Sequence, residues 1–277
     1  MRSAPHSGYG LDTGGREARS STGMSESAPF PSTPAESVRI AMWSGPRNIS
    51  TALMRSWESR GDTAVWDEPL YAHYLKETGV DHPGRDEIIR AHEGDWRRVV
   101  ARLTGPVPGG KPIFYQKHMA HHLLPQIDRS WIDEVRSAFL IRDPREMLPS
   151  LARVTPDPSV ADTGLPQQWE IFEQVAARRG APPPVVDARD ILEDPARLLA
   201  RLCEALGVPF KPAMLSWKPG PRETDGVWAK HWYSAVEASR GFQPYVPRDD
   251  EMPARPAGIH AECEAIYRRL HAHRLTG

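Results

Sequence analysis

The sequence predicts an α/β fold with three layers, αβα, in which a central and mainly parallel sheet lies between two layers of helices. Two observations support this class. From Val38 onward, short apolar runs of β type alternate with longer segments of helical periodicity, and this alternation is typical of a parallel sheet covered on both faces. The chemically distinctive polar groups follow the ends of these runs, and parallel sheets bind ligands at the carboxyl ends of their strands.

The individual elements follow from composition and periodicity. The segments with the composition of strands are 38–43, 63–66, 112–117, 135–141 and 184–188. Helical periodicity marks the segments 49–60, 85–103, 195–207 and 260–273. The predicted apolar face of the first helix is Ile49, Ala52, Leu53 and Trp57. The predicted apolar face of the last helix is Ala261, Ala265, Ile266 and Leu270.

The domain organisation follows from length and composition. The 277 residues are 39% hydrophobic and 26% charged, which is enough apolar material for one large domain. We predict a single domain over residues 37–277. Residues 1–36 are rich in Ser, Gly, Pro and Glu, so we predict a disordered tail there, with Met24 as an alternative start.

Charge and cysteine content exclude several functional classes. The net charge of −1 provides no basic field for nucleic acid or for an anionic membrane surface. Cys203 and Cys263 are too few for a disulfide framework, and both lie in helical patterns that favour a buried apolar role. No apolar run approaches the ~18 residues that span a bilayer, and the secretory-signal pattern is absent. We expect a soluble, cytoplasmic protein; the sequence does not predict its oligomeric state.

The turn after the first predicted strand has the composition of an anion site. In SGPRNIST, residues 44–51, one arginine and two hydroxyl residues lie where a strand passes into a helix. The first N–H groups of a helix lack intrahelical acceptors, and the helix dipole favours negative charge there. The alternative is that Ser44 or Asn48 caps the helix and Arg47 lies on the surface. The motif G-x-x-x-x-G-K-[ST] is absent, which disfavours a P-loop kinase.

Two further strand ends carry suitable groups. Arg142 ends one strand and Ser150 follows eight residues later, in the next helix, so that both can converge on one phosphate. His118 follows another strand and would serve as a general base because the unperturbed pKa of histidine lies near neutrality. Two alternatives stay open for His118: a histidine packed for structural reasons, and a zinc ligand with His121 and His122, although no acidic or sulfur partner has metal-site spacing.

Together these segments resemble the sulfotransferases that use 3′-phosphoadenosine 5′-phosphosulfate (PAPS). PRNIST, residues 46–51, is similar to the P-K/R-S-G-T/S-T loop of that family, and Arg142 with Ser150 matches its strand-end arginine and following serine. QKHMAHHLLP, residues 116–125, is similar to K-T-H-L-P-x-x-L-L-P. The segments 187–210 and 226–232 resemble Y-E-D-L-x-x-D-P and G-D-W-K-x-x-F. The resemblance keeps the family's order over residues 38–232.

The resemblance implies transfer of a sulfuryl group from PAPS to a hydroxyl, or alternatively an amine, of a small-molecule acceptor, without a metal. The implied phosphosulfate-binding loop consists of Arg47, Asn48, Ile49, Ser50 and Thr51. Within it Arg47 would stabilise the leaving phosphate, and His118 would be the general base. The implied contacts of the nucleotide are Arg142 and Ser150 on the 3′-phosphate, Trp228 near the adenine and, with a spacing that differs by one residue, Arg222 on a phosphate.

The acceptor side and one departure from the family leave alternatives open. The segment 66–75 offers Glu68, Tyr71 and His73 as an acceptor wall, or alternatively starts an amphipathic helix. The family loop has Ser-Gly where this chain has Asn48-Ile49, and glycine there eases unusual dihedrals and close approach. This departure supports an alternative function, a sulfotransferase-fold protein that binds a nucleotide or phosphorylated ligand without sulfuryl transfer.

Overall fold

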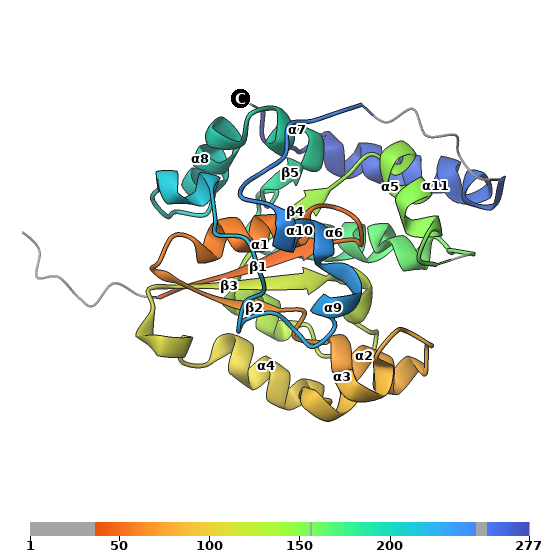
Figure 1. Ribbon diagram of the computed structural model, residues 1–277, viewed down its shortest axis with the longest axis horizontal. Coiled ribbons are helices and arrows are strands. Elements are labelled where there is room, and N and C mark those ends of the chain that lie inside the picture. Colours follow the sequence, from red (N-terminus) through yellow and green to blue (C-terminus); the bar gives the residue numbers. More distant parts are fainter. Residues whose placement is uncertain (1–36, 156, 248–253, 277) are drawn as a thin grey trace, which may run out of the picture. The chain divides into compact units, whose positions relative to one another are not determined.

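The computed structural model describes residues 37–155, 157–247 and 254–276, so the predicted tail 1–36 lies outside the described residues. Within these ranges five strands form one parallel sheet in the order β2-β3-β1-β4-β5 (Figure 1). The strands are β1 (Val38–Ser44), β2 (Thr63–Asp67), β3 (Ile113–Met119), β4 (Arg136–Ile141) and β5 (Val185–Asp187). The prediction of an α/β fold with a parallel sheet is confirmed, and each predicted strand ends within two residues of the observed one.

Helices cover both faces of the sheet because successive side chains of a strand point to opposite faces. Ile40 and Met42 of β1 contribute to one core, which includes residues of α1 (Ser50–Glu58), α7 (Ala188–Glu193) and α8 (Pro195–Ala205). Ala41 and Trp43 contribute to the opposite core, with α4 (Trp96–Thr104), α5 (Pro144–Ala152), α6 (Leu165–Arg179) and α11 (Ala254–His271). The central strand β1 is therefore buried on both faces.

A third apolar cluster joins segments that are far apart in the sequence. It contains Tyr71 and Leu75 of α2 (Tyr71–Thr78), Ile88 of α3 (Arg85–Ala91), and Trp228 and Tyr233. The last two flank α9 (Ala229–Trp232), and α10 (Ser234–Ala238) follows. In Figure 1 the strand arrows point toward the side where α2, α3 and α9 lie. Short 3₁₀ helices complete the described elements: η1 (Pro108–Gly110), η2 (Ala120–His122), η3 (Ser130–Glu134), η4 (Ala161–Thr163) and η5 (Pro212–Leu215).

Two predicted helices differ from the structure. The segment 85–103 is not one helix, because α3 ends at Ala91 and a new helix, α4, begins after Asp95, whose side chain accepts from Arg97 N at 2.9 Å. The predicted apolar face of the last helix is partly wrong. Ala261 and Ala265 are exposed, whereas Ile266 and Leu270 do pack inward. The buried face also contains Cys263 and Tyr267.

The strand order places a topological switch point, called the crevice below, between the carboxyl ends of β1 and β4. The chain leaves β1 toward β2 on one side of the sheet and leaves β4 toward β5 on the other. Loops that diverge in this way leave space between them, which is where open α/β sheets bind ligands. Among the described residues no helix combines the length and the apolar character that crossing a membrane requires.

Candidate functional site

The loop between β1 and α1 has the backbone geometry of an anion site. Arg47 and Ile49 adopt left-handed conformations, with φ of 63° and 57°, and the residue between them has an ordinary negative φ. Alternation of this kind turns consecutive N–H groups toward one point. Ile49 is the N-cap residue and no side chain caps the helix. Capping by Ser44 or Asn48 is therefore not observed, since Asn48 instead donates to Leu140 O at 3.4 Å. The other part of that alternative is observed, because Arg47 is exposed.

The loop packs closely against Thr163 and Gly164, the two residues that precede α6. A Cβ added to Gly45 would lie 2.1 Å from Thr163 O, and one added to Gly164 would lie 3.3 Å from Gly45 Cα. The buried amide of Gln168 donates to Trp43 O at 3.1 Å and to Leu140 O at 3.0 Å. It therefore ties the ends of β1 and β4 together at the base of the crevice.

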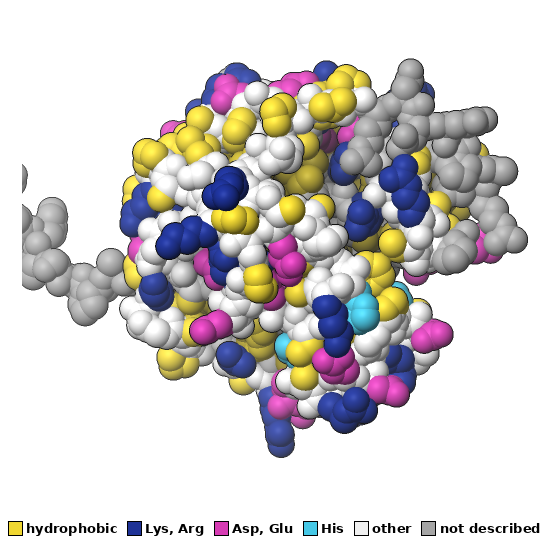
Figure 2. Space-filling model, viewed as in Figure 1, with side chains coloured by type: hydrophobic (Ala, Val, Ile, Leu, Met, Phe, Trp, Pro, Cys, Tyr) yellow, Lys and Arg dark blue, Asp and Glu magenta, His cyan; other side chains and the backbone are white. Residues whose placement is uncertain are grey.

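Three residues predicted to bind the donor meet in this crevice. Arg47 Nε donates to Ser150 Oγ at 2.9 Å, and Arg142 Nη1 donates to Arg47 O at 2.9 Å. Glu146 accepts from Arg142 at 3.0 and 3.1 Å and from Tyr245 OH at 2.5 Å, which raises the pKa of Tyr245 to about 12. Figure 2 shows Lys and Arg side chains gathered over the region of α5 on this face. The crevice therefore offers two guanidinium groups and a hydroxyl.

The structure places His118 inside the apolar layer that contains α6. Its ring stacks on Trp43 with centroids 4.5 Å apart and lies 5.7 Å from Trp131. His118 is 2% exposed, and burial lowers its pKa to about 3. Its Nε2 lies 3.4 Å from Gln116 Oε1. This environment matches the structural alternative for His118, because a base that is neither accessible nor basic cannot easily take a proton.

A buried ionic network lies at the carboxyl ends of β2 and β3. Lys117 Nζ donates to Asp67 Oδ1 at 2.8 Å, to Glu68 Oε1 at 2.6 Å and to Tyr233 OH at 2.9 Å. Tyr233 OH in turn donates to Asp67 Oδ2 at 2.6 Å and accepts from Trp228 Nε1 at 3.1 Å. Lys117, Asp67 and Tyr233 were not among the predicted site residues. The available signal was a lysine inside the apolar run 113–119, where a buried charge needs a partner.

Glu68 has three unusual properties. It is a non-glycine residue with φ of 41°, and it precedes Pro69, which further restricts its backbone. Burial raises its pKa, against the opposing attraction of Lys117, and the nearby charge of Asp67 also raises it. Its side chain keeps 12% of its surface exposed. Strained backbone and a perturbed carboxyl group together are typical of functional sites.

The other predicted acceptor residues divide into two groups. Tyr71 stacks on His122 with ring centroids 4.6 Å apart, and Tyr74 stacks on the same ring at 4.6 Å. Tyr71 therefore forms an aromatic wall beside Glu68. His73 is turned toward the loop before α4, where its Nδ1 lies 3.0 Å from Gly94 O. The alternative prediction, that 66–75 starts a helix, is confirmed, since α2 begins at Tyr71.

Arg222 and Trp228, which were also predicted to contact the nucleotide, lie away from Arg47, Arg142 and Ser150. Arg222 Nε pairs with Glu58 Oε2 at 3.3 Å, and its other nitrogens donate to the carbonyls of Gly220, Pro221 and Lys218. Glu58 ends α1, so this pair lies about 12 Å along the helix from the loop. Trp228 is 1% exposed and packs within the cluster that contains Tyr71 and Tyr233. Ser50 is buried at the first turn of α1, and Thr51 beside it is half-buried.

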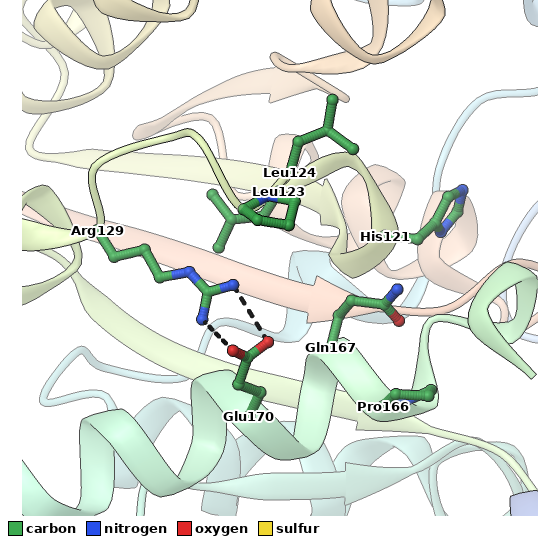
Figure 3. Close-up of a pocket in the computed structure, with 8 residues that line it drawn as sticks. His121, Leu123, Leu124, Arg129, Pro166, Gln167 and Glu170 are labelled. Atoms are coloured by element: carbon green, nitrogen blue, oxygen red, sulfur yellow. Dashed lines mark hydrogen bonds and ion pairs between the residues drawn. The ribbon is translucent and has the colours of Figure 1, made fainter. Parts of the chain in front are cut away.

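A cavity of about 390 Å³ lies between the η2 segment and the start of α6 (Figure 3). Its lining residues are His121, Leu123, Leu124, Pro125, Arg129, Pro166, Gln167 and Glu170. Arg129 and Glu170 form an ion pair of 3.0 Å at one end. At the other end His121 Nδ1 would lie 3.5 Å from a Cβ on Gly164, the residue that packs on Gly45. Gly164 therefore lies between this end of the cavity and Gly45 of the anion loop. Within the described ranges no cluster of three or more His, Cys, Asp and Glu side chains could hold a metal ion.

Comparisons with known proteins agree with the sequence resemblance. Residues 38–256 match the profile of a family described as "Sulfotransferase domain". The chain is 36% identical over 234 residues to branched-chain-amino-acid aminotransferase-like protein 2 of Arabidopsis thaliana, a match that covers 84% of this chain and 41% of that protein. It is 41% identical over 208 residues to the like-named protein 1 of the same plant, covering 75% and 37%.

The match to the plant proteins is partial. The chain spans about two fifths of their length, and their names describe the whole proteins. A solved sulfotransferase from Alicyclobacillus acidocaldarius aligns over 86% of this chain and 97% of that chain, with 12% identity and a TM-score of 0.43. A structural similarity this low carries no information about activity.

Proposed function

Because the chain belongs to the sulfotransferase domain family, we propose that it transfers a sulfuryl group from PAPS to a hydroxyl group, or alternatively an amine, of a small-molecule acceptor. The observation that supports this donor is the convergence of Arg47, Arg142 and Ser150 at one crevice. These residues come from three separate segments. Together with the turned N–H groups of the loop they suit a ligand with two separate anionic groups, as PAPS has.

The proposed roles on the donor follow from position. The loop N–H groups, Ser50, Thr51 and the Arg47 guanidinium would bind the group on which negative charge develops as the S–O bond breaks. Arg142 and Ser150 would bind the 3′-phosphate. Arg142 is now paired with Glu146, so a phosphate would compete with that carboxylate. Arg222 and Trp228 carry less weight in this proposal, because they lie at Glu58 and within the apolar cluster.

We assign the proton-accepting role to Glu68 rather than to His118. Glu68 follows β2 at the same edge of the sheet as the loop, and β2 is two strands away from β1. Two strand spacings are about 10 Å, which leaves room for a sulfuryl group and an acceptor oxygen between loop and carboxylate. A carboxyl group whose pKa is raised by burial is also a better base than an ordinary one.

The cavity beside the loop is the proposed site for the apolar part of the acceptor. Leu124, Pro125 and Pro166 provide apolar walls, and His121 at its inner end is next to His122. His122 Nδ1 lies 3.9 Å from Glu68 Oε2. We propose that an acceptor in the cavity extends its hydroxyl past His121 and His122 toward the carboxylate and the loop.

Calorimetry followed by a transfer assay tests the proposal. Adenosine 3′,5′-bisphosphate should bind at least tenfold more tightly than AMP or ATP, and Arg142→Ala should remove most of this preference. Sulfuryl transfer from PAPS over a panel of aryl and alkyl alcohols should then be abolished in Glu68→Gln and largely kept in His118→Asn. Binding of the bisphosphate with no transfer to any acceptor would favour the alternative function, and equal binding of all three nucleotides would refute the donor assignment.

A further inference from the structure

The ionic network at the ends of β2 and β3 uses every donor of one buried lysine. An ammonium group has three N–H donors, and those of Lys117 are directed at Asp67 Oδ1, Glu68 Oε1 and Tyr233 OH, at 2.8, 2.6 and 2.9 Å. The Lys117 side chain is 1% exposed. Asp67 is fixed in turn, because its second oxygen accepts from Tyr233 OH at 2.6 Å. The Lys117 ammonium is therefore held by three hydrogen-bond acceptors, one for each of its N–H donors.

The two oxygens of Glu68 have different surroundings as a consequence. Oε1 lies on the Lys117 ammonium at 2.6 Å, whereas Oε2 lies 3.9 Å from His122 Nδ1, beyond hydrogen-bond distance. His122 is sandwiched between Tyr71 and Tyr74, so its ring cannot turn freely toward the carboxylate. The carboxylate is thus held by one oxygen and presents the other toward the aromatic wall.

We propose that Lys117, held by Asp67 and Tyr233, positions the carboxylate of Glu68 so that Oε2 accepts the acceptor proton. This inference rests on the proposed function, in which Glu68 is the base. Lys117 touches neither acceptor nor donor in this arrangement and acts through Glu68, and it is therefore a positioning residue. In the transfer step the acceptor O–H bond breaks as its oxygen attacks sulfur. The proton goes to Oε2, a bond forms between the acceptor oxygen and sulfur, and the S–O bond to the nucleotide phosphate breaks with its electron pair left on the phosphate oxygen.

The same network controls the charge of Glu68. The titratable groups that face it are Asp67 on β2, Lys117 on β3, His122 on η2, Tyr71 on α2, and Tyr233 between α9 and α10. Burial raises the pKa of Glu68, Lys117 lowers it, and Asp67 raises it again. Lys117 itself stays charged, because its two carboxylate neighbours outweigh the effect of burial on its pKa. Lys117 and Asp67 therefore act on Glu68 in opposite directions.

Opposite shifts in two variants test this inference. In protein labelled with ¹³C at the glutamate carboxyl carbons, the signal absent from Glu68→Gln identifies Glu68, and its pKa can be followed directly by NMR. Lys117→Met should raise that pKa by about one to three pH units, and Asp67→Asn should lower it. Lys117→Arg, which keeps the charge, should leave it closer to the wild-type value. General loosening of the fold would instead lower the pKa of Glu68 toward the ordinary carboxyl value in both Lys117→Met and Asp67→Asn, so that the two shifts would have the same sign.

The outcome separates this inference from the proposed function, because the titration needs no sulfuryl transfer. Binding of adenosine 3′,5′-bisphosphate confirms that each variant is folded at the loop. If Lys117→Met does not fold, Lys117→Gln takes its place and should likewise raise the pKa of Glu68, because it also removes the positive charge. Shifts of the same sign in Lys117→Met and Asp67→Asn, or an unmoved Glu68 signal in Asp67→Asn, would overturn the inference. Where transfer is measurable, the acid limb of kcat/KM should move with the NMR value.

Discussion

Replacement of Gly45 by alanine should disable the anion loop without touching any charged group. The added Cβ would lie 2.1 Å from Thr163 O, and real Cβ atoms essentially never come closer than 3.0 Å to such an atom. The loop and the end of η4 must therefore separate by at least 0.9 Å, the difference between these two distances. Overpacking of this kind costs about 1–3 kcal/mol of folding free energy. Hydrogen bonds from the loop N–H groups tolerate only about 0.5 Å of lengthening, so donor affinity should fall at least about tenfold, or ~1.4 kcal/mol.

Urea unfolding and calorimetry with adenosine 3′,5′-bisphosphate measure the two effects separately. Gly258→Ala is the matched control, because Gly258 lies exposed in α11 and a Cβ there meets nothing within 4 Å. The control should be neutral or stabilising by up to about 1 kcal/mol, with unchanged affinity. A Gly45→Ala protein with wild-type affinity and wild-type free energy of unfolding would refute the argument that this close contact fixes the loop.

Three further predictions follow from the same geometry. Arg47→Ala should lower kcat more than it weakens bisphosphate binding, and Arg142→Ala should weaken binding more than it lowers kcat. Calorimetry and steady-state kinetics on both variants measure the two effects, and the opposite assignment of effects would contradict the proposed roles. Gln167→Trp should fill the cavity and raise KM for an apolar acceptor while bisphosphate affinity stays unchanged, and an unchanged KM would remove the cavity from the acceptor site. Burial raises the pKa of Asp187 from 3.8 to about 6, so its contribution to stability is complete below about pH 3.8 and is lost as pH rises through about 6. The loss amounts to about 3 kcal/mol. In Asp187→Asn this decline should be absent from urea unfolding curves at pH 4 to 7, and a parallel decline in wild type and variant would contradict the assignment.

The sequence predicted the sheet well because each strand is a short apolar run whose identity depends on local composition. It could not predict which side chains of β3 face the site. Along 113–119 every residue is buried, since both faces of a parallel sheet are covered, and apolar alternation is therefore lost. Because successive side chains of a strand point to opposite faces, Lys117 points to one face and His118 to the other. The sequence resemblance drew attention to the histidine, and only the neighbouring elements reveal that Trp43 and Trp131 enclose it.

Long-range segments set a second limit on prediction. Arg47 and Arg142 lie close together because each comes shortly after a strand, and parallel strands end at one edge, whereas Ser150 reaches them from α5. Arg222 and Trp228 lie in the irregular stretch after η5, where no periodicity fixes the path of the chain. Their positions depend on pairing with Glu58 and with Tyr233. Arg222 and Glu58 are more than 150 positions apart, whereas Trp228 and Tyr233 are five positions apart in a segment without periodicity. Neither contact leaves a pattern in the sequence.

Ile49 shows how this loop keeps its path without the family's glycine. A β-branched residue in the left-handed region costs about 1–2 kcal/mol, so the conformation with φ of 57° must be stabilised elsewhere. The Ile49 side chain packs against the core that contains Leu53 and Trp57, and burial of such a side chain contributes a similar amount. Gly45 and Gln168 fix the strand ends on either side. Packing of the Ile49 side chain therefore compensates for the strain of its own backbone, and the loop keeps left-handed conformations at both Arg47 and Ile49.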